Sequence, residues 1–121
     1  MNQFEELKVW QLAHKFVLDV YVILNKIPSE EKRALLDQLR RSAISIPANI
    51  VEGSERKTNK EFVQFLYVSK GSLAESRYYL ILARDLKYIS KAEYQNLIEQ
   101  AIVISKMTMS LIKYLKSTSK T

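Results

Sequence analysis

The sequence contains no cysteine, and its 121 residues include only two glycines and two prolines. Without cysteine the chain can form neither a disulfide nor a thiolate metal site, so nothing marks it as secreted and we expect a cytoplasmic protein. Glycine and proline build the tight turns of sheet proteins, and their scarcity favours an all-α fold. Hydrophobic residues make up 47% of the chain, enough for a chain of this size to bury its own core. We therefore expect a single domain over residues 1–121.

Long apolar runs are also missing. Charged residues interrupt every apolar stretch well before the roughly 20 residues that a membrane-spanning helix needs. The chain begins MNQFEE, which is acidic, whereas a signal peptide begins with basic residues. We expect a protein that neither spans a membrane nor is exported by a signal peptide.

The residues that carry most enzyme chemistry are scarce. His14 is the only histidine, and no GxSxG nucleophile elbow, glycine-rich phosphate loop or cofactor fingerprint accompanies it. A di-iron bundle needs Glu-x-x-His motifs on two helices, which a chain with one histidine cannot supply. Glu52 and Glu75 could form a carboxylate pair, but a salt bridge to an arginine such as Arg40 or Arg77 is the simpler interpretation. We therefore expect no enzymatic activity, no metal and no cofactor.

Apolar residues instead recur at three- and four-residue spacing, the pattern of helices with one buried face. This spacing predicts four helices, at about residues 7–27, 30–52, 59–86 and 91–116. Pro28 separates the first two helices. Thr58 with Glu61, and Ser90 with Glu93, have the spacing of capping boxes at the start of the last two. Because the connections are short, consecutive helices run antiparallel, and we expect an up-and-down four-helix bundle.

The second helix is apolar on nearly all sides between residues 43 and 51, where only Ser45 and Asn49 are polar. A bundle buries one stripe of each helix, so this stretch predicts a second cover, supplied by another subunit. The alternative is a wide core contact within one chain. The residues expected at the subunit interface are Ile44, Pro47 and Val51.

Three residues interrupt the regular helical pattern. Pro47 removes a backbone hydrogen bond and predicts a kink, with Ser45 and Asn49 near enough to satisfy the freed backbone group or to bridge to a neighbouring helix. Gly53 is a natural C-terminal cap of the second helix. Gly71, inside the third helix, predicts the close approach of another helix. We interpret all of these residues as structural.

The chain carries a formal net charge of +6, and this charge is unevenly distributed. Residues 1–31 contain three basic and five acidic groups, whereas residues 32–70 and 71–121 each contain eight basic and four acidic groups. Candidate nucleic-acid contacts surround the second helix, its connection and the first half of the third helix: Lys32, Arg33, Arg40, Arg41, Arg56, Lys57, Lys60, Lys70 and Arg77. No aromatic platform interleaves these residues, so we expect contacts to phosphates rather than stacking on bases.

Three segments resemble one protein family. They read LKVWQLA at residues 7–13, QLRRSAISIPANIVEG at residues 38–53 and GSLAE at residues 71–75. In these segments the chain resembles the 23S rRNA intervening-sequence proteins, a bacterial family of four-helix bundles. The resemblance implies a homopentameric ring, genes that often lie inside intervening sequences of 23S rRNA genes, and no catalytic residues. A similar bundle, the accessory variability protein of diversity-generating retroelements, is a basic pentamer that binds nucleic acid and a reverse transcriptase.

Two functions from different classes stay open at this point. The first is an oligomer that binds RNA or DNA through basic residues repeated on every subunit. The alternative is a scaffold that binds a partner protein and has no nucleic-acid binding of its own. Salt-sensitive retention of nucleic acid during purification would favour the first function.

Overall fold

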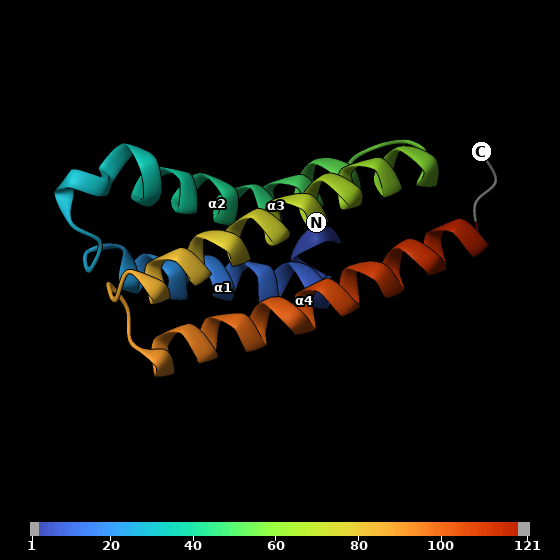
Figure 1. Ribbon diagram of the computed structural model, residues 1–121. Helices are drawn as coiled ribbons and strands as arrows, with labels where there is room; N and C mark the ends of the chain where they lie inside the picture. The colour runs from blue at the N-terminus through green and yellow to red at the C-terminus, as the bar shows by residue number, and fades with distance from the viewer. Residues whose placement is uncertain (1–2, 119–121) are drawn as a thin grey trace.

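The computed structural model describes residues 3–118, and this part of the chain contains four long helices and no strand (Figure 1). The long helices are α1 (Lys8–Leu24), α2 (Asp37–Ser54), α3 (Asn59–Asp85) and α4 (Lys91–Ser117). The short segments are the 3-10 helices η1 (Gln3–Glu6) and η2 (Ser29–Glu31) and the π-helix η3 (Lys32–Leu36). The prediction of an all-α fold with four helices is confirmed. The two ends of the predicted domain, residues 1–2 and 119–121, lie outside the described residues.

Consecutive long helices run antiparallel and lie side by side (Figure 1). α1 and α3 each pack against both α2 and α4, so the four helices enclose one core. Two side-chain contacts show the register of α1 and α4. Gln100 donates a hydrogen bond to Asp19 at 2.7 Å, and Lys26 pairs with Glu93. Because the residue numbers rise along α1 as they fall along α4, these contacts require antiparallel helices.

The apolar stripes of the four helices form this core. The largest fully buried side chains are Phe16, Val20, Leu35, Leu39, Ile46, Ile50, Leu66, Leu73, Leu80, Leu97, Ile104 and Ile112. Burying each such side chain stabilises the fold by roughly 1.5–3 kcal/mol relative to leaving it in water. Leu86, the last residue of the predicted third helix, is 44% exposed, because α3 ends one residue earlier and the chain turns there.

The starts of α3 and α4 are capped by side chains. Ser90 accepts a hydrogen bond from the backbone N–H of Glu93, and the Glu93 carboxylate accepts one from the backbone N–H of Ser90, which confirms the predicted capping box. Thr58 accepts from the backbone N–H of Glu61 at 3.1 Å, but its own hydroxyl, not its backbone, donates to the Glu61 carboxylate. The second predicted box is therefore only half formed. Each cap contributes about 1 kcal/mol.

The end of α3 is closed by a left-handed residue that is not glycine. Lys87 has a φ of 67°. The backbone N–H groups of Lys87 and Tyr88 donate to the carbonyls of Arg84 and Ala83, both at 2.9 Å. This pairing is the Schellman motif, which normally places glycine at the left-handed position. A lysine there costs conformational energy that the other contacts of the turn offset.

The second helix begins later than predicted. After Pro28 the chain forms η2 and then η3, and regular α-helix starts only at Asp37 instead of near residue 30. The π-type turn is shown by the hydrogen bond from the Asp37 N–H to the Lys32 carbonyl, five residues back. The apolar spacing alone does not distinguish these backbone patterns, because Leu35 and Leu39 face the core in either case.

Serines line the contact between α2 and α3. Their hydroxyls form hydrogen bonds across it: Ser42 with Ser76 (2.7 Å), Ser45 with Ser72 (2.8 Å) and Ser69 with the carbonyl of Ile46 (2.9 Å). Asn49 donates to the carbonyl and to the hydroxyl of Ser45, both at 2.8 Å. The predicted bridging role of Ser45 is thus confirmed. Small side chains with paired hydroxyls let two helices approach closely without burying an unsatisfied polar group.

The two glycines have the opposite of their predicted environments. α2 continues through Gly53 to Ser54, so Gly53 is not a C-terminal cap. A Cβ atom on Gly53 would lie 2.7 Å from Cδ1 of Phe62 and 2.8 Å from Cβ of Phe65, which shows that this glycine permits the close approach of α3. Gly71 is exposed, and a Cβ atom there would meet nothing within 4 Å. Gly53 does not adopt a positive φ, so the left-handed cap is not formed there, and the prediction for Gly71 was wrong because the sequence does not show how α3 is rotated about its axis.

The predicted interface residues of α2 do not share one environment. Pro47 is buried inside the protomer, so its assignment to a subunit interface is wrong. Pro47 directly follows Ile46, the centre of the buried stripe, and faces the core with it; the wide core contact is the correct interpretation at this residue. Ile44 is 41% exposed and Val51 is half-buried. The outward face of α2 therefore keeps only part of the apolar surface that the sequence suggested.

Candidate nucleic-acid interface

The predicted basic residues fall into separate groups in the structure. Lys32, Arg33, Arg40 and Arg41 lie in η3 and at the start of α2. Lys32 and Arg40 both bind the same carboxylate, Asp37, at 3.3 and 2.8 Å. Arg33 and Arg41 are exposed and form no ion pair with a described residue. Much of the charge in this group is therefore neutralised locally.

A second group lies at the other end of α2. Arg56, Lys57 and Lys60 follow the helix, and Arg56 is 15 residues after Arg41, or about 22 Å along a helical path. Arg56 pairs with Glu52 at 2.9 Å and lies 4.8 Å from the centre of the Phe65 ring. The nine predicted cations thus do not form one patch, and only Lys57 and Lys60 of this group are exposed and without a carboxylate among the described residues.

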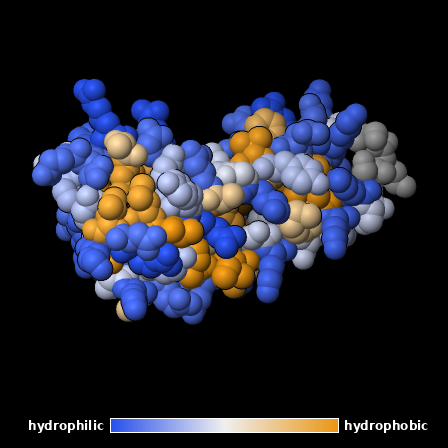
Figure 2. Space-filling model, viewed as in Figure 1, coloured by the Kyte–Doolittle hydropathy of each residue, from blue (hydrophilic) through white to orange (hydrophobic). Residues whose placement is uncertain are grey.

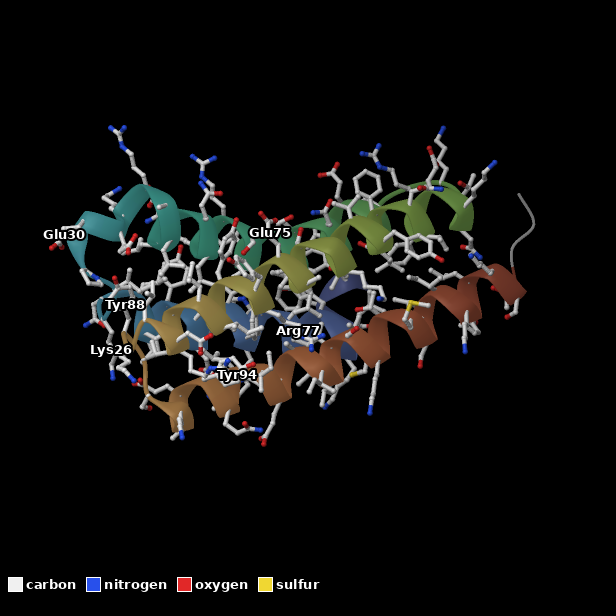
Figure 3. The ribbon with its side chains drawn as sticks, viewed as in Figure 1. Lys26, Glu30, Glu75, Arg77, Tyr88 and Tyr94 are labelled. Carbon is white, nitrogen blue, oxygen red and sulfur yellow. The ribbon has the colours of Figure 1, made fainter. Side chains whose placement is uncertain are left out.

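Lys70 and Arg77 lie on the side of α3 that faces α4. They are seven residues apart and continue the line of Val63, which packs beside Leu115 of α4 in the same groove. Figure 3 shows Arg77 on this side of α3. Both cations are half-buried, and within residues 3–118 neither has an ion-pair partner. They add positive charge to the contact between α3 and α4.

The last half of α4 supplies basic residues that the sequence interpretation missed. Lys106, Lys113 and Lys116 are exposed, and their spacing of seven and three residues places them on one side of the helix. The sequence contains no Asp or Glu after Glu99, and none in residues 62–74 of α3. This absence of carboxylates can be read from the sequence. It indicates a basic surface only if the two segments lie together in the fold.

Two contacts show that these segments do lie together. Asn59, the first residue of α3, donates to the carbonyl of Leu115 near the end of α4 at 3.3 Å. The ammonium of Lys116 donates to the hydroxyl of Tyr67 at 3.1 Å. We call the surface between the start of α3 and the end of α4 the basic groove. Its cations are Lys60 and Lys70 of α3 and Lys116 of α4, and the exposed Lys106 and Lys113 lie on α4 beside it.

The end of the basic groove contains a hollow of about 290 Å³. It is lined by Asn59, Lys60, Val63, Gln64, Tyr67, Leu115 and Lys116. Tyr67 is 42% exposed, and Nζ of Lys116 lies 5.4 Å from the centre of its ring. The expectation that no aromatic ring interleaves the basic residues is therefore wrong for this groove. On the right of Figure 2, hydrophilic side chains border a strip of hydrophobic ones at this end of the molecule.

Two cations at the opposite end of the bundle have carboxylate partners. Lys26 binds Glu93, and this hydrogen bond, with that of the Ser90 N–H, holds the pKa of Glu93 below its ordinary value. Arg84 pairs with Asp85 at 2.9 Å and lies 4.4 Å from the centre of the Tyr94 ring. Figure 3 labels Lys26 and Tyr94 at this end. Asp85 and Glu93 thus lie among the cations of this end, although Lys87 and Lys91 form no ion pair with a described residue.

The carboxylates singled out in the sequence have other partners than predicted. Glu52 pairs with Arg56, one turn along α2, and not with Arg40. Glu75 accepts a hydrogen bond from the Tyr79 hydroxyl at 3.0 Å and not from Arg77. Partial burial of the phenol and this hydrogen bond raise the pKa of Tyr79. The prediction of a salt bridge to an arginine is confirmed for Glu52, with Arg56 as the partner, and is wrong for Glu75, whose partner is Tyr79 one helical turn away.

His14 is exposed and stacks on Trp10, with ring centres 5.1 Å apart and an angle of 6° between the planes. Within the described range no group of three or more His, Asp or Glu side chains is placed to hold a metal ion. None of the helices between residues 3 and 118 is both long and apolar enough to cross a membrane.

Comparison with known proteins relates the chain to one family. The family model described as 23S rRNA-intervening sequence protein matches residues 5–110. Among solved structures, a protein with unknown function of the S23 ribosomal protein family from Bacteroides thetaiotaomicron is similar, with a TM-score of 0.80 and 25% identity. That match covers 87% of this chain and 98% of the other. No curated protein sequence matches the chain. The chain therefore belongs to the 23S rRNA-intervening sequence protein family.

Proposed function

We propose that this protein is a non-enzymatic, oligomeric bundle that binds nucleic acid, RNA in particular, through the basic groove between α3 and α4. The observation that carries the proposal is the segregation of charge. Lys60, Lys70 and Lys116 belong to this groove and the exposed Lys106 and Lys113 lie beside it on α4, whereas residues 62–74 and the part of the chain after Glu99 contain no carboxylate. A surface of this kind attracts a polyanion over a distance of about 8–10 Å at ordinary salt concentrations.

The spacing of the lysines suits contacts to a phosphate backbone. Lys106 and Lys113 are about 10 Å apart along α4, which corresponds to roughly three phosphates at 3.4 Å per nucleotide of one strand. Lysine is a flexible point charge and binds phosphates without reading bases. We therefore expect binding that is weakly sequence-selective and strongly salt-dependent. The log–log slope of affinity against salt should reach about −3 to −5 for one protomer.

The experiment is a fluorescence-anisotropy titration of structured RNA and duplex DNA at several salt concentrations. The test variant replaces Lys60, Lys113 and Lys116 with glutamine. The matched control replaces Lys32, Arg33 and Arg41 with glutamine, which removes the same charge from the start of α2. All six side chains are exposed, so neither variant removes a core contact.

We expect the groove variant to lose affinity and to flatten the salt slope by about 3, because each lysine contact releases about one counterion. The control should keep most of the slope. Equal losses of affinity in both variants would mean that binding depends on the net charge of the protein and not on the groove. Absence of binding by the unmodified protein at about 50 mM salt would remove the proposal and leave the scaffold for a partner protein.

We also propose self-association, as the family resemblance implies a homopentamer. The structural support is the exposed Ile44 on α2, which lies two helical turns before the half-buried Val51. In a ring every copy would present its basic groove, and the local concentration of lysines around one nucleic acid would rise without any new contact.

A further inference from the structure

Tyr67 differs from the other exposed aromatic residues in its position among lysines. Its ring is 42% exposed, and Lys60 lies seven residues before it on the same side of α3. Lys116 reaches it from α4 and donates to its hydroxyl at 3.1 Å. This hydrogen bond links the ring of Tyr67 to α4. The ring therefore has cations on two sides and an open hollow beside it.

The hollow beside Tyr67 has a lining that suits a flat ligand. Its apolar part comes from Val63 and Leu115, which are both buried. Gln64 and Asn59 add amide groups at its edge. Its volume of about 290 Å³ is near the lower end of the range for small-molecule pockets, which is about 300–1,000 Å³. It therefore has room for one planar ring system with polar edges, and the lysines lie where a charged backbone would pass.

We propose that this hollow takes one unpaired base of a single-stranded nucleic acid, stacked on Tyr67, with the adjoining phosphates bound by Lys60 and Lys116. The proposal rests on the proposed function, because it names the substrate class of the same groove. Every base has an aromatic face, so stacking on Tyr67 tolerates any sequence. In a duplex the bases are stacked on each other and paired, so a duplex offers phosphates to the lysines but no base to Tyr67.

The test compares the affinity of each variant for an unstructured oligonucleotide and for a duplex of equal length, in RNA and in DNA. Tyr67→Leu removes the aromatic face but keeps an apolar side chain, and Tyr67→Phe keeps the face but loses the bond to Lys116. The control is Tyr21→Leu, on α1, where the tyrosine is 48% exposed. Circular dichroism establishes that each variant is folded. A second measurement uses Tyr67→Trp, whose fluorescence should be quenched by a stacked base beyond any change at Trp10.

We expect Tyr67→Leu to weaken single-strand binding roughly 5- to 150-fold, the usual effect of losing one base–aromatic stack, while duplex affinity and the salt slope stay unchanged. Tyr67→Phe should keep most of the affinity, and Tyr21→Leu all of it. Equal affinity of Tyr67→Leu and the unmodified protein for single strands overturns the inference. If that result accompanies salt-dependent binding that the lysine variant abolishes, the proposed function survives alone. Absence of any binding by the unmodified protein overturns both.

Discussion

The two glycines allow a test of the packing between α2 and α3, because the same substitution should have opposite effects at each. Alanine is better than glycine inside a helix by about 0.5–1 kcal/mol, and this gain applies at Gly53 and at Gly71 alike. At Gly71 the new methyl group meets nothing within 4 Å. We therefore expect Gly71→Ala to raise the free energy of unfolding by about 0.5–1 kcal/mol.

At Gly53 the methyl group would lie 2.7 Å from Cδ1 of Phe62 and 2.8 Å from Cβ of Phe65. The Phe62 ring can rotate, but the Cβ of Phe65 is fixed to the backbone, so α3 itself must move. Such overpacking costs about 1–3 kcal/mol. The helix-propensity term is common to both variants and cancels in their difference. Gly53→Ala should therefore be less stable than Gly71→Ala by about 1–3 kcal/mol.

The assay is urea and thermal denaturation followed by far-UV circular dichroism, at one protein concentration because self-association would make stability depend on it. In a domain of this size each kcal/mol changes Tm by roughly 3–5 °C, so the difference between the two variants is measurable. Equal stabilisation by both substitutions would refute the reasoning, since it would mean that α3 does not approach Gly53 closely.

Three further predictions concern other parts of the molecule. Lys87→Gly should stabilise the protein by about 0.5–1 kcal/mol, because glycine adopts the left-handed φ of 67° without steric cost. A lower stability of this variant in urea denaturation would show that the lysine side chain supports the turn. The pKa of Glu93 is lowered in the fold from its ordinary value of 4.5, so the ionised carboxylate stabilises the protein at pH values above 4.5, and this contribution is lost as the pH falls through the folded pKa. Unfolding in urea between about pH 3 and 6 should therefore depend less on pH in Glu93→Gln than in the unmodified protein. Ile44→Glu should convert an oligomer into a folded monomer in sedimentation velocity, because Ile44 is 41% exposed in the protomer; an unmodified protein that is already monomeric at micromolar concentration would contradict the proposed self-association.

Features that depend on neighbours in the sequence could be predicted from it. The capping box of Ser90 and Glu93 formed as expected because both residues lie within one turn. The buried stripe through Leu39, Ile46 and Ile50 follows from the period of the helix, which fixes the residues that share a face. The number of helices and most of their ends follow from the same local pattern.

Features that depend on how helices meet could not be predicted. Lys116 and Tyr67 are 49 residues apart, and their contact depends on the register of α3 against α4. The environments of Gly53 and Gly71 depend on the rotation of each helix about its axis, which side-chain volumes across the whole core decide together. The predicted site covered residues 32–77 and so included Lys60 and Lys70 of the basic groove, but it missed the lysines of α4, which are far away in the sequence.

The central claim, that nucleic acid binds in the basic groove, is tested most directly by photo-cross-linking. The unmodified protein is irradiated with a bound single-stranded RNA, digested, and analysed by mass spectrometry for peptides that carry nucleotides. We predict cross-links in residues 57–70 of the α2–α3 connection and α3, with Tyr67 foremost, and in residues 106–117 of α4. Cross-links confined to residues 29–41, in η2, η3 and the start of α2, would contradict the claim.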